Sequence, residues 1–256
     1  MTSARAASEH CVLVTGATSG FGRATARRFV AAGARVIAAG RRTERLAALV
    51  KECGDRLLPV PLDVRDEAAV FAAVAALPSG FADVSVLVNS AGLALGLEPA
   101  HQVSVNDWTT MIDTNVRGLA MVTRAVLPGM VARGRGHVIN LGSIAGEYPY
   151  PGGNVYCGTK AFVRQFSLAL RADLHSRNVR VTVVEPGMAE TEFSEVRLKD
   201  TAKAKAVYQG IQALSAEDVA ETVYWAAMLP DHVNINVIEV MPTAQAFGPF
   251  AVHRTP

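Results

Sequence analysis

Short runs rich in β-branched residues alternate along this chain with longer stretches of amphipathic helical periodicity. The short runs are apolar at successive positions, which is typical of parallel strands that are buried on both faces of a sheet. Strands and helices that alternate in this way fold as right-handed βαβ units. We therefore predict an α/β fold with one doubly wound, seven-stranded parallel sheet and helices on both faces. The predicted strands are residues 12–15, 35–39, 57–63, 84–89, 137–141, 179–185 and 237–241.

The 256 residues suffice for one α/β domain with a full-sized core, and no repeat or linker divides them. We expect residues 1–256 to form a single domain that begins with a flexible tail over residues 1–10. Residues 190–214 are weakly periodic and rich in charge, and they follow the sixth predicted strand. They fit a mobile substrate lid or an ordinary surface excursion equally well. The predicted helices are residues 23–32, 44–51, 67–76, 107–133, 156–177 and 216–228.

The composition excludes several classes of protein. Half of the residues are hydrophobic and 19% are charged, a balance that rules out a disordered chain. The net charge of +2, without a run of like charges, argues against a nucleic-acid partner. No stretch approaches the roughly 18 apolar residues of a membrane span, and the N-terminus lacks a secretory signal, so we expect a cytoplasmic protein without membrane contact. The three cysteines and six histidines lack ligand spacing, so we expect no metal.

A glycine-rich turn lies directly between the first predicted strand and the first predicted helix. Glycines permit a tight turn and a close backbone approach to a pyrophosphate, while the helix N-terminus offers free N–H groups and a positive dipole end. This position between strand and helix predicts dinucleotide binding, and hence a Rossmann-type domain. The turn consists of Thr15, Gly16, Ala17, Thr18, Ser19, Gly20, Phe21 and Gly22.

The end of the second predicted strand indicates which dinucleotide is bound. NAD-binding units usually carry an acidic residue there, which binds the ribose hydroxyls. In this chain Gly40 is followed by Arg41 and Arg42. A guanidinium group offers paired donors that match a 2′-phosphate. The alternative is an ordinary solvated basic pair, but positive charge near a helix N-terminus is slightly unfavourable. We therefore predict NADP as the cofactor.

Tyr156 and Lys160 provide the strongest catalytic signal. They are four residues apart at the start of a predicted helix, so they share one face. An ammonium group beside a phenol lowers the phenol pKa from about 10, as a general acid/base near neutral pH requires. Ser143 follows the fifth predicted strand, where its hydroxyl could stabilise charge on a substrate oxygen. The neighbouring Cys157 is an alternative nucleophile, but it lacks an obvious histidine partner.

Together these motifs resemble the short-chain dehydrogenases and reductases over residues 11–241. The resemblance implies that Tyr156 exchanges a proton with the substrate oxygen, which Ser143 positions. It also implies that Lys160 binds the nicotinamide ribose and that Asn115 holds a water linking Lys160 to solvent. Ser90 departs from the asparagine that is usual at the second position of the family's Asn-Asn-Ala-Gly motif. The predicted cofactor contacts are Gly16, Thr18, Ser19, Gly20, Phe21, Gly22, Arg41, Arg42, Asp63, Val64, Asn89, Ala91, Gly92, Tyr156, Lys160, Pro186, Gly187 and Thr191.

Further stretches resemble one branch of that family, the serine 3-dehydrogenases and 3-hydroxy acid dehydrogenases. This implies that a small 3-hydroxy acid, of the serine, allo-threonine or 3-hydroxypropionate type, is interconverted with its semialdehyde. It also implies a homotetramer, with the predicted helices 107–133 and 156–177 at one interface. Sulfoacetaldehyde reductases are similar in the same regions, so that substrate or another small carbonyl is an alternative. A non-catalytic NADP-binding regulatory or scaffold protein is a further one, although we would expect it to lack Tyr156 or Lys160. The matching stretches are residues 91–96, 111–115, 152–156, 160–168, 234–236 and 252–254.

A hydroxy acid carries a carboxylate, and burying that charge without a cation is costly. Lys160 is already committed to the ribose and to the tyrosine. We therefore expect Arg197, within the lid segment, to bind the carboxylate with its planar fork. The alternative is an exposed Arg197 that pairs with Glu192 or Glu195. The predicted substrate contacts are Ser143, Tyr150, Tyr156, Arg197 and Gln245.

Overall fold

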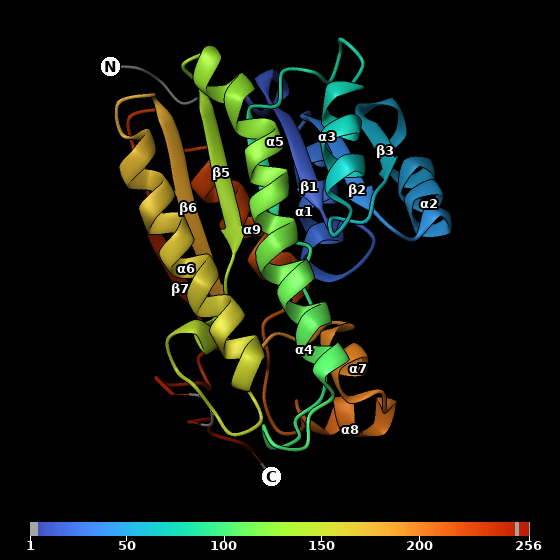
Figure 1. Ribbon diagram of the computed structural model, residues 1–256, viewed down its shortest axis with the longest axis vertical. Helices are drawn as coiled ribbons and strands as arrows, with labels where there is room; N and C mark the ends of the chain where they lie inside the picture. The colour runs from blue at the N-terminus through green and yellow to red at the C-terminus, as the bar shows by residue number, and fades with distance from the viewer. Residues whose placement is uncertain (1–4, 249–250, 256) are drawn as a thin grey trace.

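The computed structural model describes residues 5–248 and 251–255. Its strands form one seven-stranded sheet in the order β3-β2-β1-β4-β5-β6-β7 (Figure 1). Every neighbouring pair is parallel, which confirms the predicted fold class. The strands are β1 Cys11–Thr15, β2 Arg35–Gly40, β3 Leu57–Pro61, β4 Val86–Asn89, β5 Gly136–Leu141, β6 Val179–Pro186 and β7 Val237–Val240.

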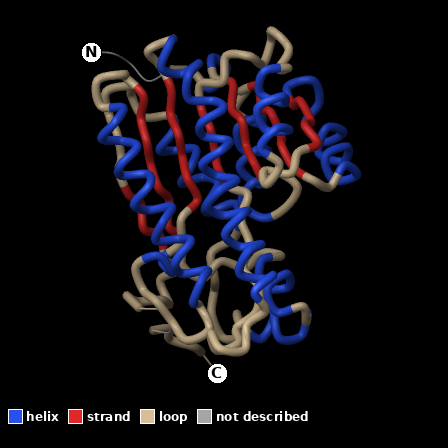
Figure 2. Tube along the Cα trace, in the orientation of Figure 1, coloured by secondary structure: helices blue, strands red, loops and turns tan. Residues whose placement is uncertain are grey.

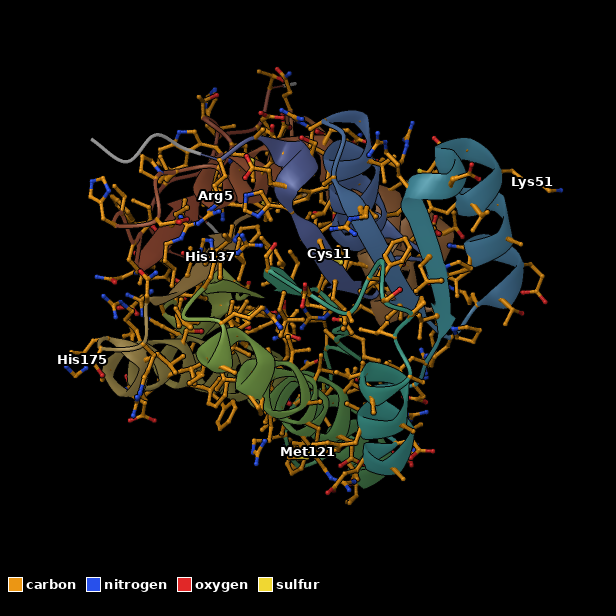
Figure 3. The ribbon with its side chains drawn as sticks, turned by 90° about the horizontal axis from the view of Figure 1, so that it is seen from above. Arg5, Cys11, Lys51, Met121, His137 and His175 are labelled. Carbon is orange, nitrogen blue, oxygen red and sulfur yellow. The ribbon has the colours of Figure 1, made fainter. Side chains whose placement is uncertain are left out.

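Two helical layers cover the sheet. In Figure 3, the view from above, the sheet lies between them, and Met121 marks the outer side of one layer. Strand β1 shows how one strand serves both layers, because its side chains alternate between the faces. One layer contains α1 Gly20–Ala31, α2 Thr43–Cys53 and α9 Ala216–Ala227, and the other contains α3 Glu67–Ala75, α5 Leu119–Ala132 and α6 Asn154–Leu174. In β1, Val12 and Val14 pack in the core beneath α1 and α9, whereas Cys11 and Leu13 pack beneath α5 and α6.

The order of the strands reverses between β1 and β4. Hydrogen bonds connect the carboxyl end of β1 to the residues that follow β4. The Thr15 hydroxyl accepts hydrogen bonds from the backbone N–H groups of Ser90 and Ala91, both at 3.1 Å. Gly16 follows at φ +69°, and a Cβ on it would lie 2.9 Å from the backbone of Ala91. Only glycine fits this turn. In doubly wound sheets such a switch point opens the crevice in which ligands bind.

The predicted helix over residues 107–133 is interrupted in the structure. Helix α4 (Val105–Ile112) passes into a π-helical turn, η3 (Asp113–Gly118), before α5 begins at Leu119. Within that turn, Asn115 hydrogen-bonds the backbone of Leu93 and so adds a tertiary contact. Amphipathic periodicity does not register a single π turn, which is why the sequence suggested one helix. Such turns are frequent at functional sites.

The segment after β6 lies beyond the carboxyl ends of the strands. It folds into two short helices, α7 (Phe193–Leu198) and α8 (Thr201–Ala206), at the lower end of Figure 1. Figure 2 shows this end as loops and short helices, in contrast to the regular layers around the sheet. Ala189 and Leu214 pair in an isolated parallel bridge, so the segment starts and returns at the same place.

The expected N-terminal tail differs from the structure over residues 5–10; residues 1–4 lie outside the described residues. Ala7–Glu9 form one turn of 3₁₀ helix, and Arg5 Nε donates to Asp231 Oδ2 at 3.0 Å. His10 is buried, with its Nδ1 3.1 Å from the Ser85 hydroxyl. These tertiary contacts, which local composition does not reveal, hold residues 5–10 against the domain. In the described part of the chain, no helix combines the length and hydropathy needed to cross a bilayer.

Candidate active site

A cavity of about 600 Å³ lies at the carboxyl ends of the strands. Its walls come from the segments that follow β1, β4, β5 and β6, from the start of α6 and from α7. Segments far apart in the sequence therefore meet there, as in other doubly wound sheets. The predicted site residues that it brings together are Phe21, Gly92, Ser143, Tyr150, Tyr156, Lys160, Pro186, Gly187, Thr191, Arg197 and Gln245.

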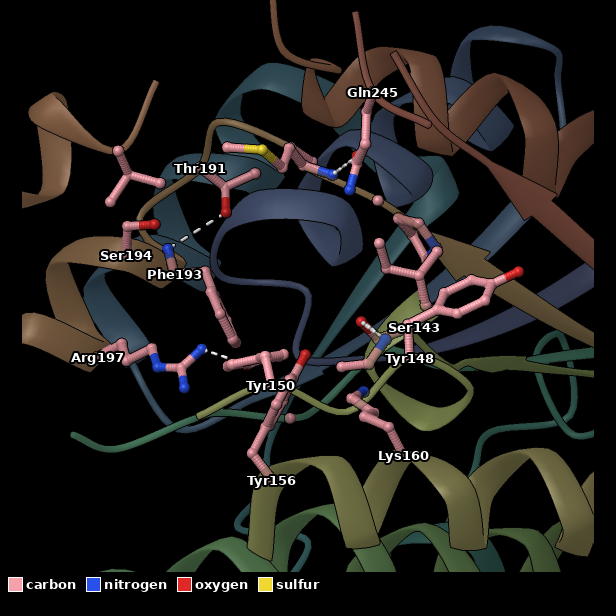
Figure 4. A pocket seen from close by; sticks show the side chains of 18 of the residues that line it. Ser143, Tyr148, Tyr150, Tyr156, Lys160, Thr191, Phe193, Ser194, Arg197 and Gln245 are labelled. Atoms are coloured by element: carbon pink, nitrogen blue, oxygen red, sulfur yellow. Dashed lines mark hydrogen bonds between the residues drawn. The ribbon is translucent and has the colours of Figure 1, made fainter. Parts of the chain in front are cut away.

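Tyr156 and Lys160 lie on the first turns of α6, where both side chains face the cavity (Figure 4). The Lys160 ammonium donates to the Leu141 carbonyl at 2.8 Å and lies 5.9 Å from the centroid of the Tyr156 ring. Tyr156 also forms a hydrogen bond with the Ser143 side chain. The three groups proposed for catalysis are therefore adjacent, at the junction of β5 and α6.

The protonation of this group follows from its burial. Burial raises the pKa of the Tyr156 phenol above its ordinary value, and the Ser143 hydrogen bond and the Arg197 charge oppose that shift only in part. Burial also lowers the pKa of Lys160 to about 8, against the opposing charge of Glu185. This differs from the expectation that the ammonium lowers the phenol pKa. The reason is that both groups share one dry site, where each charged form is disfavoured.

Asn115 is held beside Lys160. Its side-chain amide donates to the Leu93 carbonyl at 2.8 Å and to the Thr159 hydroxyl at 3.1 Å, while its oxygen accepts from Leu93 N–H at 2.9 Å. A Cβ on Gly92 would lie 3.3 Å from the Asn115 oxygen and 3.6 Å from the Lys160 ammonium. The π turn thus packs the loop after β4 closely against Lys160. The predicted water at Asn115 stays a prediction.

The predicted cofactor end of the site, which consists of the glycine-rich turn and the residues after β2, contains an arginine pair. Arg42 donates to the hydroxyls of Thr18 at 3.1 Å and Ser19 at 2.5 Å, and to the Glu192 carboxylate at 3.2 Å. Arg45 binds both oxygens of the same carboxylate, at 2.6 and 2.8 Å. The end of β2 and the glycine-rich turn therefore form a site that already holds an anionic group. Arg41, the other predicted phosphate ligand, is exposed, and its charge acts on Asp63.

The predicted cofactor contacts Asp63, Val64 and Asn89 lie outside the cavity. Asp63 forms an ion pair with Arg65, whose hydrogen bonds hold the carboxyl pKa below its usual range. The Val64 side chain packs against the backbone of Gly118. Asn89 is buried, and its amide nitrogen donates to the side chains of Thr123 and Asn140, both at 2.9 Å. The Asn89 side chain thus holds β4 to α5 and β5, and the structure does not bring it into the cavity.

Arg197 and Tyr150 form the wall opposite Ser143 and Lys160 (Figure 4). Arg197 donates to the Tyr150 hydroxyl at 2.6 Å and to the Gly96 carbonyl at 3.0 Å. Its guanidinium carbon lies 5.5 Å from the centroid of the Tyr156 ring. Since Glu192 pairs with Arg42 and Arg45 at the start of α2, the structure does not support the alternative in which it neutralises Arg197.

Gln245 closes the cavity from the C-terminal side. Its oxygen accepts from Met188 N–H at 2.8 Å, and a Cβ on Gly187 would collide with it. Its nitrogen is buried and finds no hydrogen-bond acceptor among the described residues. A buried donor without a protein partner, lining a cavity, is available to a ligand.

Comparison with known proteins assigns the family. Residues 10–202 match the short chain dehydrogenase family. The chain belongs to this family. It is 61% identical over 246 residues to the NADP-dependent 3-hydroxy acid dehydrogenase YdfG of Salmonella typhi, covering 95% of this chain and 99% of that protein. It is 54% identical over 244 residues to serine 3-dehydrogenase of Agrobacterium fabrum, covering 95% and 98%.

Solved structures agree with this assignment. The closed form of a serine dehydrogenase complexed with NADP⁺ superposes with a TM-score of 0.92 at 58% identity, covering 95% of this chain and 99% of that one. The serine dehydrogenase from Escherichia coli superposes with a TM-score of 0.83 at 55% identity, covering 92% and 99%. The resemblance inferred from the motifs is thus confirmed, and the chain is a short-chain dehydrogenase over nearly its whole length.

Sequence reasoning missed two residues of this short-chain dehydrogenase that the structure places at the cofactor end. Arg45 lies in the first turn of α2, three residues after Arg42 at the N-cap, a spacing that could have suggested a second cation. Glu192 was considered only as a partner for Arg197. No sequence signal shows that it reaches the end of β2, because that contact joins positions about 150 residues apart in the chain.

Proposed function

We propose that this short-chain dehydrogenase uses NADP(H) to interconvert a small 3-hydroxy acid with its 3-oxo acid or semialdehyde. The observation that supports the acid most directly is the position of Arg197, whose cation lies over the Tyr156 ring inside the cavity. A substrate that presents an oxygen to Tyr156 and a carboxylate a short distance away matches these two groups. The names of the relatives, a 3-hydroxy acid dehydrogenase and a serine 3-dehydrogenase, support the same substrate class.

The residues present fit NADP. The fork of Arg42 and Arg45 already binds a carboxylate, which stands in for the 2′-phosphate, and the Ser19 hydroxyl lies beside it. The turn from Gly16 to Gly22 is so tight that a Cβ on Gly22 would lie 2.4 Å from the Gly16 carbonyl, leaving backbone N–H groups to face a pyrophosphate. When bound, NADP(H) accepts or supplies the hydride of the reaction.

The protein side of the reaction is proton transfer and positioning. Tyr156 exchanges the proton with the substrate oxygen. Ser143, whose side chain hydrogen-bonds Tyr156, holds the same substrate oxygen. The Lys160 ammonium, 5.9 Å from the centroid of the Tyr156 ring, offsets part of the cost that burial adds to forming the phenolate. A guanidinium group has five N–H donors. Arg197 directs some of them to protein oxygens and keeps others for the carboxylate, which the Gln245 nitrogen can also bind.

We further propose that residues 190–214 act as a lid and that the enzyme is a homotetramer. For the lid, α7 carries both Arg197 and Phe193, whose ring centroid is 5.5 Å from that of Tyr156, so its closure excludes water from the acid/base. For the tetramer, α6 presents the partly exposed Phe162 stacked on Phe166, and Val105 at the start of α4 is 73% exposed. Apolar surface of this kind on long helices suits a symmetric interface.

The test compares an anionic semialdehyde with a neutral aldehyde of the same size in the Arg197→Met variant. If Arg197 binds the carboxylate, kcat/KM for the anion falls by about 30-fold or more, because a buried carboxylate loses its cation. The neutral aldehyde changes by less than about threefold in that case, within the scatter of an altered packing contact. Lys203→Met removes an exposed charge on α8 and serves as the matched control. It should leave kcat/KM for both aldehydes unchanged. Equal losses for both aldehydes would mean that Arg197 only shapes the lid.

A further inference from the structure

Glu192 links the two ends of the site. It directly follows Thr191, which lines the cavity, and it directly precedes α7. Its carboxylate accepts from Arg42 at 3.2 Å and from Arg45 at 2.6 and 2.8 Å. These hydrogen bonds hold the carboxyl pKa below its usual range despite partial burial. The segment expected to close over the substrate is therefore fastened near its start, at Glu192, to the first turn of α2.

The partners of this carboxylate are the groups that a phosphate monoester would use. The guanidinium groups of Arg42 and Arg45 meet at this carboxylate, and the Ser19 hydroxyl accepts a hydrogen bond from Arg42 beside it. A phosphate has three oxygens and about two negative charges, so it satisfies more of these donors than a carboxylate does. Both anions cannot occupy the same donors, and the side chains involved are 41% to 46% exposed, which leaves them accessible to an incoming ligand.

We propose that Glu192 is a specificity-determining latch: its carboxylate occupies the position of the cofactor 2′-phosphate, and only a cofactor that carries this phosphate displaces it and releases the start of α7. The proposal rests on the proposed use of NADP. A cofactor without the phosphate leaves Glu192 on Arg42 and Arg45. The lid segment is therefore released when the bound cofactor carries the 2′-phosphate and stays fastened when it does not.

The released segment is the one that builds the substrate end. Phe193 is the next residue and contacts the Tyr156 ring, and Arg197 lies one turn further along α7 and binds Tyr150. Freeing Glu192 lets this short helix adjust around a substrate without breaking an ion pair at the residue that precedes it. Binding of the phosphate at one end of the site thus prepares the lid at the other end.

The first experiment measures dissociation constants by calorimetry for 2′,5′-ADP, NADP⁺ and NAD⁺. In Glu192→Gln the competitor for the arginines is neutral, so 2′,5′-ADP and NADP⁺ bind about threefold to tenfold more tightly, as expected for the loss of two solvent-accessible ion pairs. NAD⁺ binding stays within about twofold, since NAD⁺ does not contest these donors. Glu195→Gln removes an exposed charge from the same helix and serves as the matched control.

The second experiment follows the lid by limited trypsin digestion. Lys199, Lys203 and Lys205 are exposed in and beside α8, so cleavage there reports how firmly the segment is held. We expect 2′,5′-ADP to accelerate this cleavage in the wild-type protein and 5′-ADP to leave it unchanged. Glu192→Gln should be cleaved at the faster rate without any ligand. Cleavage that does not respond to 2′,5′-ADP would overturn the coupling to the lid.

An Arg42→Ala variant separates the two proposals. If it binds NADP⁺ and NAD⁺ as the wild-type protein does, the phosphate site itself is wrong, and NADP use fails with it. If Arg42→Ala weakens NADP⁺ selectively but Glu192→Gln binds 2′,5′-ADP no better than Glu195→Gln does, only the latch is overturned. Equal tightening of NADP⁺ and NAD⁺ in Glu192→Gln would also overturn it, because the effect would then be unrelated to the phosphate.

Discussion

The catalytic end and the phosphate end of the site hold charge in opposite ways. At the catalytic end, Tyr156 and Lys160 are each 8% exposed. Burial raises the pKa of Tyr156 and lowers the pKa of Lys160, so that it favours the neutral form of both groups. At the phosphate end, the side chains of Arg42, Arg45 and Glu192 are 41% to 46% exposed and form ion pairs with one another. Ion pairs in contact with water exchange partners at little cost, whereas a buried group is fixed in place.

This difference suits the two tasks. Proton transfer benefits from groups that are held in one geometry, in a site that excludes water, before the substrate arrives. Selection of a cofactor by its phosphate requires charges that are kept satisfied until the phosphate replaces their partner. The site thus combines a dry, preorganised end inside the cavity with a wet, exchangeable end formed by Arg42, Arg45 and Glu192, which are not among the residues that line the cavity.

The largest effect should come from the dry end. Tyr156→Phe keeps the ring packed against Phe193 and removes only the hydroxyl that exchanges the proton. General acid–base catalysis contributes about 10²- to 10⁴-fold, so kcat should fall by at least that order. NADPH binding, followed by its fluorescence, should persist because the phosphate end is untouched. Turnover close to that of the wild-type protein would remove Tyr156 from the mechanism.

A smaller effect is expected from pH. Burial lowers the pKa of Lys160 to about 8, so its ammonium is charged below that pH and neutral above it. Because the charged form assists Tyr156, kcat/KM for carbonyl reduction should fall about tenfold per pH unit above pH 8 in the free enzyme. The raised pKa of Tyr156 keeps the phenol protonated over this range, so the change belongs to Lys160.

Glu185 provides the check on that assignment. Its charge raises the pKa of Lys160, so Glu185→Gln should move the alkaline limb of kcat/KM to lower pH. Arg164, which pairs with Glu185, and Glu147 and Glu239 nearby remain in this variant. A profile that is flat to pH 10 in the wild-type protein would show that Lys160 does not titrate in the working range.

The same contrast explains what the sequence could reveal. Strand periodicity and the glycine-rich turn are local signals, so the sheet and its seven strands were predictable. Tyr156 and Lys160 lie four residues apart on one helix, so their proximity was predictable as well. The direction of the phenol pKa shift was not, because burial of Tyr156 depends on packing by Phe193 and other distant residues. The contact of Glu192 with Arg42 joins segments that no local pattern relates, and the sequence carried no sign of it.

Ionic strength should produce the smallest effect and separate the two ends most directly. Raising the salt from about 0.1 M to 1 M shortens the screening length from about 10 Å to about 3 Å, which weakens exposed charge pairs far more than enclosed ones. NADP⁺ should then bind about threefold to tenfold more weakly, while NAD⁺, which lacks the phosphate, should change by less than about twofold. Screening also loosens Glu192 from the arginines, which offsets part of the loss and keeps it modest. The KM of an anionic substrate should respond less than the dissociation constant of NADP⁺, because Arg197 is enclosed between Tyr150 and Tyr156.

Parallel salt slopes for NADP⁺ and NAD⁺ would show that the exposed arginines do not select the phosphate. A substrate KM as sensitive to salt as NADP⁺ binding would show that Arg197 is open to solvent in the working enzyme, and the contrast between a dry end and a wet end would then fail.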